Sequence, residues 1–169
     1  MNWYLKDSKF WLILSIILGT VILSIATYFR WIRIHVAVGP FYIDHWLVLI
    51  GVLYTGIATP LIYILKRRYK KRISSLLNSH IFGNLLSFTG ISMHFAQQIG
   101  RPAQYYPDLG TGVALFLVMS TLVSCGFLHR FGIIKNVQRA RANRYLHISV
   151  ATAFYFVIGI HILQGFHLL

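Results

Sequence analysis

The sequence predicts an all-α integral membrane protein whose single domain, residues 1–169, is a bundle of five transmembrane helices. Composition is the first observation behind this prediction: 57% of the residues are hydrophobic, 11% are charged, and the mean hydropathy is +0.65. A soluble domain of this size needs far more polar surface. The second observation is that five apolar segments reach the roughly 20 residues that a helix needs to cross a bilayer. The third is that basic residues gather between these segments.

The five predicted spans are residues 10–29, 45–65, 78–98, 111–129 and 146–167. The apolar run of the first is too long for a signal peptide and has no convincing cleavage site, so we expect a retained helix. Pro60 lies in the second span and predicts a kink there. Residues 30–44 are rich in aromatic side chains and are expected at the membrane interface, whereas residues 99–110 are expected to form a turn region.

The distribution of basic residues predicts the orientation of the chain. With five crossings, the N-terminal segment, residues 66–72 and residues 129–144 lie on one side of the membrane, and together they hold 13 of the 16 Lys and Arg residues. The other side has Arg30, Arg33 and Arg101. The positive-inside rule then places the N-terminus in the cytoplasm and the C-terminus outside the cell membrane. Contact with anionic membrane lipid is a further role for the same charges.

Composition also excludes several classes of site. The formal net charge is +13, but basic residues placed between apolar spans do not resemble a nucleic-acid-binding module, so we exclude nucleic acid as a partner. The single cysteine, Cys125, excludes an internal disulfide, a cysteine-based zinc site and an iron–sulfur cluster built by this chain alone. We expect Cys125 to be a small buried apolar residue.

Four histidines lie in predicted spans at a repeated spacing. His80 and His94 are fourteen residues apart in the third span, and His147 and His161 are fourteen apart in the fifth. At about 100° and about 1.5 Å per residue, the second imidazole returns to within about 40° of the first and lies about 21 Å further along the helix. Because one span separates them, the two helices run parallel. We therefore expect His80 to meet His147 near the cytoplasmic face, and His94 to meet His161 near the external face.

Two imidazoles approaching from opposite sides are the axial ligands of a b-type heme. The spacing therefore predicts two heme b groups, an inner one held by His80 and His147 and an outer one held by His94 and His161. Their iron would alternate between ferric and ferrous states, because both axial positions are filled. The alternative is that the histidines are polar residues bonded across the bundle, although intramembrane histidines more often have a function.

Small residues accompany the histidines. Gly83 and Gly90 lie beside the stripe of His80 and His94, and the fourth span has a further pair of glycines, again fourteen residues apart, at Gly112 and Gly126. We expect these glycines to leave room for the flat macrocycle. Their alternative role is the ordinary packing of membrane helices.

Two other kinds of side chain complete the predicted site. Phe154 lies midway between His147 and His161, where an aromatic ring would fill the gap between the hemes. Arg144 and Arg101 are candidates to pair with heme propionates, with a surface position as the alternative for Arg101.

The other four histidines are expected at the surface or the membrane interface; they are His35, His45, His129 and His167. A quinone or proton-transfer role is the alternative for His129, beside Arg130, and for His45, beside Asp44.

The two ligand segments, NSHIFGNLLSFTGISMH and NRYLHISVATAFYFVIGIH, resemble the ferric reductase-like transmembrane family, which includes NADPH oxidases and ferric reductases. In that family a basic loop leads to an aromatic residue and Leu-His, with a second histidine about one helix height later. Residues 144–147 and His161 fit this pattern. The resemblance covers about residues 45–167 and implies a heme domain whose ligand helices run from inside to outside.

The ligand segments are also similar to those of cytochrome b in quinol–cytochrome c reductases. There, His-x-x-Gly opens the first ligand helix, as His80 to Gly83 does here. The corresponding helices of that family run in the opposite direction, and its quinone-site motifs are missing from this chain. This resemblance therefore ranks second.

The departures from the first family shape the expected function. Its members usually have six helices and continue into flavin and nicotinamide domains, whereas this sequence has no Gly-rich dinucleotide motif and stops at Leu169. We therefore expect a di-heme cytochrome b subunit of an oxidoreductase that transfers electrons across the membrane. Its donor would be a quinol or a cytoplasmic protein, and its acceptor an external molecule or a partner redox subunit. The alternatives are a heme-containing membrane anchor or quinone-reactive cytochrome b subunit, and a proton-relay transporter.

Overall fold

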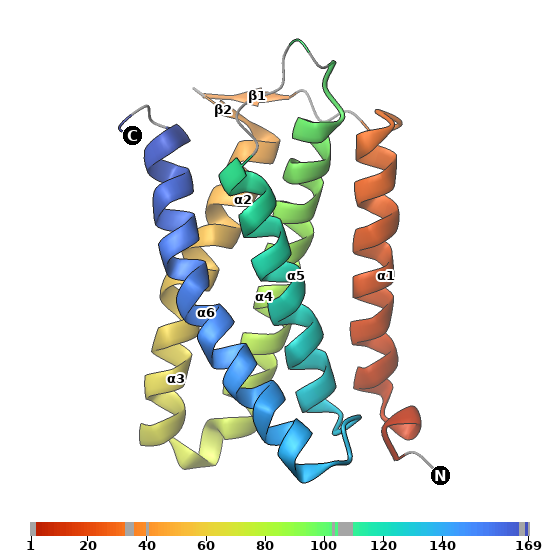
Figure 1. Ribbon diagram of the computed structural model, residues 1–169, viewed down its shortest axis with the longest axis vertical. Coiled ribbons are helices and arrows are strands. Elements are labelled where there is room, and N and C mark those ends of the chain that lie inside the picture. The colour runs from red at the N-terminus through yellow and green to blue at the C-terminus, as the bar shows by residue number, and fades with distance from the viewer. Residues whose placement is uncertain are drawn as a thin grey trace. The chain divides into compact units, whose positions relative to one another are not determined.

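The computed structural model describes residues 3–32, 36–39, 41–102, 104, 110–165 and 168. Within them the secondary structure is helical, apart from one ribbon of two short strands, so the predicted all-α class is confirmed (Figure 1). The chain divides into two compact units: unit 1 is Met1–Phe10 with Ala103–Leu169, and unit 2 is Trp11–Pro102.

Four stretches of helix among the described residues are long and apolar enough to cross a membrane; they are Ser8–Tyr28, His45–Arg68, Gly110–Arg130 and Val137–Gly165. They coincide with four of the five predicted spans and are compatible with a membrane protein. The remaining predicted span corresponds to α4 (Ile73–Ile99), which has 27 residues and no charged side chain. Polar residues such as Asn78 and Asn84 lower the mean hydropathy of α4, so its crossing stays a prediction.

Unit 2 contains most of α1 (Ser8–Tyr28) and a ribbon of β1 (Ala37–Val38) and β2 (Phe41–Tyr42). The next helical stretch consists of α2 (Ile43–Leu53), a π-helical turn η2 (Tyr54–Ala58) and α3 (Thr59–Arg68); η3 (Lys70–Arg72) then leads into α4. The π turn ends at Ala58, two residues before Pro60. Proline has no N–H to donate to the preceding turn, which is the physical reason for a disturbance of the helix at this point.

Small residues bring α2 close to α4 in unit 2. A Cβ added at Gly51 would lie 3.1 Å from the Cα of Ser87, and one at Gly90 would lie 3.7 Å from the Leu47 carbonyl oxygen. These contacts fix an antiparallel register, because later residues of α2 face earlier residues of α4. Close backbone approach through small residues is the usual basis of helix association in a bilayer.

The first helix packs on α4 in a parallel direction. The hydroxyls of Thr20 and Thr89 are 2.7 Å apart, and further along both helices a Cβ at Gly100 would lie 2.7 Å from the Tyr28 carbonyl oxygen. Neighbouring helices in unit 2 therefore alternate in direction in the order of the chain, as the predicted topology requires.

Unit 1 is built around an antiparallel hairpin of α5 (Gly110–Arg130) and α6 (Val137–Gly165), which lie side by side in Figure 1. Gly132, at φ +56°, occupies a left-handed conformation in the connection. The next helix begins at Val137, nine residues before the predicted start at 146. Its early start has a local cause, because the side-chain oxygen of Asn136 accepts a 3.0 Å hydrogen bond from the Arg139 backbone N–H and caps the first turn.

Aromatic packing fixes the N-terminal segment, which includes η1 (Trp3–Lys6), within unit 1. The ring centroid of Phe10 lies 5.4 Å from that of Phe127 and 5.0 Å from that of Phe131, and Phe131 is fully buried. Edge-on and tilted ring pairs at these distances are favourable. The contact brings the basic N-terminal segment to the end of unit 1 where α5 and α6 are connected.

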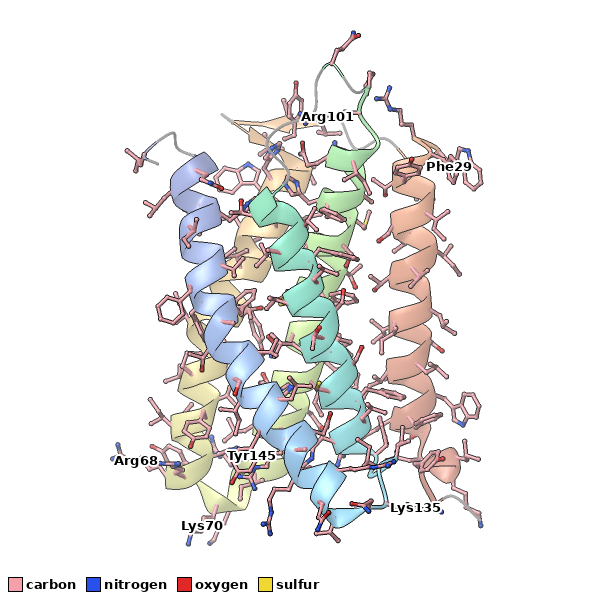
Figure 2. The ribbon with its side chains drawn as sticks, in the orientation of Figure 1. Phe29, Arg68, Lys70, Arg101, Lys135 and Tyr145 are labelled. Carbon is pink, nitrogen blue, oxygen red and sulfur yellow. The ribbon has the colours of Figure 1, made fainter. Side chains whose placement is uncertain are left out.

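Charge is segregated by helix end in each unit. In unit 1, Lys6 and Lys9 share an end with the basic connection of α5 and α6. In unit 2, Arg68 and Lys70 lie at one end, and Arg101 lies at the other with Phe29 (Figure 2). The Arg30 side chain also lies at that second end, where it donates to the Gly100 carbonyl at 3.2 Å. The sidedness of the membrane protein stays a prediction, and Arg33 lies outside the described residues.

Candidate functional site

The four predicted ligands lie on two continuous helices. His80 and His94 belong to α4 in unit 2, and His147 and His161 belong to α6 in unit 1. Neither helix is interrupted between its two histidines, so each fourteen-residue spacing does return the imidazoles to one face. All four side chains are partly buried. Each predicted ligand pair takes one histidine from each unit, and this pairing stays a prediction.

The two histidines of α6 lie against the two glycines of α5. A Cβ added at Gly126 would lie 3.4 Å from Cε1 of His147, and one at Gly112 would lie 3.7 Å from Cε1 of His161. The two glycines are fourteen residues apart on α5, and the two histidines are fourteen residues apart on α6. Because the helices are antiparallel, the same glycine–histidine contact therefore occurs twice. The predicted role of these glycines was to admit a porphyrin edge, and the structure adds that they accommodate the imidazole rings.

Between these two contacts the hairpin has a closely packed layer. Phe154 is midway between the two histidines of α6 and is 1% exposed, and Met119 is midway between the two glycines of α5 and is 2% exposed. Large buried side chains at this level separate the two histidine levels and exclude water from the space between them.

The His161 ring has a polar partner on α5. Its Nδ1 lies 3.0 Å from the Thr111 hydroxyl, and that hydroxyl lies 2.6 Å from the side-chain oxygen of Gln164. The sequence analysis did not select Thr111 or Gln164. One signal was available for Gln164, because it follows His161 by three residues and so shares its helix face.

The His147 ring differs from that of His161. Its buried Nδ1 has no side-chain hydrogen-bond partner among the residues that the structure describes, and the ring interacts with the Leu122 backbone of α5. One turn earlier, the buried Asn143 amide donates to the Cys125 carbonyl at 3.0 Å and fixes this part of α6 against α5. Cys125 itself is buried, as predicted. Arg144 is exposed, and its pairing with a propionate stays a prediction, as does that of the exposed Arg101.

His80 is part of a polar network in unit 2. The side-chain nitrogen of Asn84, one turn later on α4, lies 3.1 Å from Nδ1 of His80 and donates to the His80 carbonyl at 2.7 Å. The same amide exchanges hydrogen bonds of 3.1 and 3.2 Å with the Thr59 hydroxyl of α3. The sequence could have indicated Asn84 as a neighbour of His80, because it lies four residues later on the same helix. The contact with Thr59 could not be predicted, because it depends on the register of α3 against α4.

The glycines of α4 face the second helical stretch of unit 2. The Tyr54 ring of the π turn lies against Gly83, with its hydroxyl donating to the Ser79 carbonyl at 2.7 Å, and Gly90 faces Leu47. Of the two roles considered for these glycines, helix packing is the one that unit 2 displays. Their role toward a macrocycle stays a prediction.

His45 lies closer to a predicted ligand than the sequence suggested. It is partly buried in the first turn of α2, and its ring centroid lies 5.6 Å from that of His94 in an edge-to-face arrangement. The ring centroid of Tyr42 lies 6.2 Å from that of His45. Antiparallel packing of α2 on α4 produces this contact, which sequence periodicity alone does not reveal. His129 is exposed near the end of α5, as predicted, whereas His35 and His167 lie outside the described residues.

Comparison of the chain with protein-family models, with curated proteins and with solved structures gives no match. The resemblances to the ferric reductase-like family and to cytochrome b therefore stay predictions that depend on the residues of α4 and α6.

Proposed function

We propose that this protein is a di-heme b-type cytochrome subunit that transfers electrons across the cell membrane. In this proposal, His80 and His147 hold an inner heme, and His94 and His161 hold an outer heme. The observation that carries it is the fourteen-residue pair of partly buried histidines on each of two uninterrupted helices. Ionisable side chains are costly inside a membrane, and a repeated placement on two helices favours a shared function.

The residues around the histidines of α6 fit such a group. Each imidazole of α6 has a glycine of α5 at its Cε1 edge, so no Cβ crowds that edge of the ring. The buried Nδ1 of His147 and the bonded Nδ1 of His161 leave Nε2 as the ligating atom of each ring. Ligation by His80 through Nε2 requires a proton on Nδ1. The Asn84 amide nitrogen, which faces Nδ1 and donates to the His80 carbonyl, would then have to move away from the ring. When bound, heme b supplies one-electron chemistry between ferric and ferrous iron.

The rest of the chain supports this role by its placement. Large apolar side chains are exposed along α1, α2 and α6, which suits contact with membrane lipid. The basic residues at one end of each unit suit a cytoplasmic face with the N-terminus inside and the C-terminus outside. The donor is then a quinol or a cytoplasmic protein, and the acceptor is external, with other redox subunits as the expected partners.

Histidine variants test the assignment of ligands. We expect His80→Ala and His94→Ala each to retain one of two hemes and to stop electron transfer from a cytoplasmic donor to an external dye in proteoliposomes. The matched control is His129→Ala, because His129 is an exposed histidine of the same hydrophobic chain. Full heme content in both ligand variants would contradict the proposal.

A quinone-reactive cytochrome b subunit is the second candidate, and the contact of His45 with His94 favours it. An imidazole beside a heme ligand is placed to accept the proton that a quinol releases as it is oxidised. His45→Gln should then slow heme reduction by a soluble quinol while leaving reduction by dithionite unchanged. Equal loss of both reactions would assign His45 a structural role.

A further inference from the structure

The hydrogen bonds at Thr111 determine which nitrogen of His161 carries a proton. A threonine hydroxyl has one proton to donate, and an amide oxygen can only accept. The 2.6 Å contact with the Gln164 oxygen uses that proton, so the Thr111 oxygen is left as an acceptor toward the His161 ring at 3.0 Å. With the Gln164 amide oxygen facing Thr111, Nδ1 of His161 is the protonated nitrogen, and Nε2 keeps its lone pair.

From this chain of hydrogen bonds we infer that Thr111, oriented by Gln164, is a positioning residue that fixes the tautomer of His161 and lowers the redox potential of the heme bound there. The inference rests on the proposed function. A hydrogen-bond acceptor at Nδ1 makes the imidazole a stronger electron donor through Nε2, and a stronger donor stabilises ferric over ferrous iron.

The effect belongs to one heme only. The His147 ring, on the same helix, has no such side-chain hydroxyl among the described residues and interacts instead with the Leu122 backbone of α5. The two levels of α6 therefore differ in their polar neighbour, because the Thr111 hydroxyl lies at His161 alone, although both rings lie against a glycine of α5. Removal of the Thr111 hydroxyl should act on the His161 level and leave the other unchanged.

A pair of substitutions isolates the hydroxyl. Thr111→Val keeps the shape of the side chain and removes the acceptor, whereas Thr111→Ser keeps the acceptor. In a spectroscopic redox titration of the purified heme protein, Thr111→Val should favour the ferrous form of one heme about tenfold, which is about 59 mV for a one-electron couple. The wild-type potential should return in Thr111→Ser.

Thr121 provides the matched control on the same helix. Thr121 is partly exposed, and its hydroxyl donates to the Leu117 carbonyl at 2.8 Å, one turn back on α5. Thr121→Val should leave both potentials unchanged. A shift in both hemes, or the same shift in Thr111→Ser as in Thr111→Val, would overturn the inference.

The tautomer gives a second readout that separates this inference from the proposed function. In protein labelled with ¹⁵N-histidine and kept reduced, the ring nitrogen shifts of His161 should report a proton on Nδ1 in the wild type. A proton on Nε2 would overturn the inference whether or not heme is present. If the purified wild type contains no heme, the proposed function fails, and this measurement still decides the tautomer. If Thr111→Val retains two hemes with unchanged potentials, the inference alone fails.

Discussion

At the scale of single residues, the contacts between α5 and α6 depend on the absence of a side chain. A Cβ added at Gly126 or Gly112 would lie at ordinary contact distance from a histidine ring. We therefore expect alanine to fit at these positions and a longer side chain to clash with the ring. Side-chain atoms beyond Cβ would occupy the space of the imidazole ring, and displacing that ring from a closely packed interior is destabilising.

Gly126→Leu should therefore displace His147 and remove the heme that it holds, with about half of the heme absorbance lost. The measurement is the α-band absorbance per mole of purified chain. Gly159→Leu is the matched control, since a Cβ at Gly159 would meet nothing within 4 Å. Equal heme loss in both variants would show that leucine harms the bundle without regard to the histidine contact.

Residue-scale features differed in how far the sequence predicted them. The spacing of the histidines and of Gly112 and Gly126 is visible in one dimension, because a helix converts sequence spacing into a common face. The partnership of Thr111 with His161 joins residues fifty positions apart and depends on the register of two helices. Periodicity carries no information about that register, so this part of the site emerged only from the structure.

At the scale of elements, the second helical stretch shows how a proline prediction is realised. The π turn over Tyr54–Ala58 ends two residues before Pro60, and its Tyr54 ring lies against Gly83 of α4. Single π turns in membrane helices are frequent at functional positions. Here the turn joins α2 and α3 into a stretch of 24 residues that still meets the length and composition of a membrane span.

Gly83→Ala should destabilise the packing of this stretch on α4, because a Cβ at Gly83 overlaps the Tyr54 ring. We expect a loss of about 1–3 kcal/mol, the usual cost of an overpacked interior. Unfolding in sodium dodecyl sulfate, followed by circular dichroism, measures it. Tyr54→Leu in the same chain should recover part of the loss, whereas Gly56→Ala should cost nothing, since its Cβ would be in open space. A destabilisation that Tyr54→Leu does not relieve would contradict the overlap.

Element boundaries were predicted less well than element existence. The next helix after α5 begins nine residues before the predicted span because Asn136 caps it and arginine and alanine favour a helix beyond the apolar run. Hydropathy reports where a helix meets lipid, not where its backbone hydrogen bonds begin. In α4 the polar residues lower the mean hydropathy of the sequence, although their side chains form hydrogen bonds within unit 2. Hydropathy alone therefore understates how well this long helix suits a membrane span.

At the scale of the whole molecule, the segregation of charge by helix end supports a membrane orientation. Six basic residues lie in segment 66–72, in the last turn of α3 and in η3, whereas among the described residues the opposite end of unit 2 has Arg30 and Arg101. An asymmetry of this size is the usual determinant of which loops stay in the cytoplasm.

Two single-cysteine variants test both this orientation and the crossing by α4. In a Cys125→Ala background, Lys70→Cys and Arg101→Cys place one thiol before and one after α4. A membrane-impermeant maleimide should label Arg101→Cys in intact cells and label Lys70→Cys only after permeabilisation. Labelling of both variants in intact cells would mean that α4 does not cross the membrane, and the reverse pattern would mean that the orientation is inverted.

The central claim is that one chain holds two b hemes, and a heme-to-protein ratio tests it most directly. A pyridine hemochrome assay on the purified protein, normalised to chain concentration by amino-acid analysis, counts the hemes per 19.4 kDa chain. The histidine pairs of α4 and α6 predict a ratio of two, with the absorbance of heme b and no covalently attached heme. A ratio of one would break the pairing of His80 with His147 and of His94 with His161, and a ratio of zero would refute the cytochrome itself.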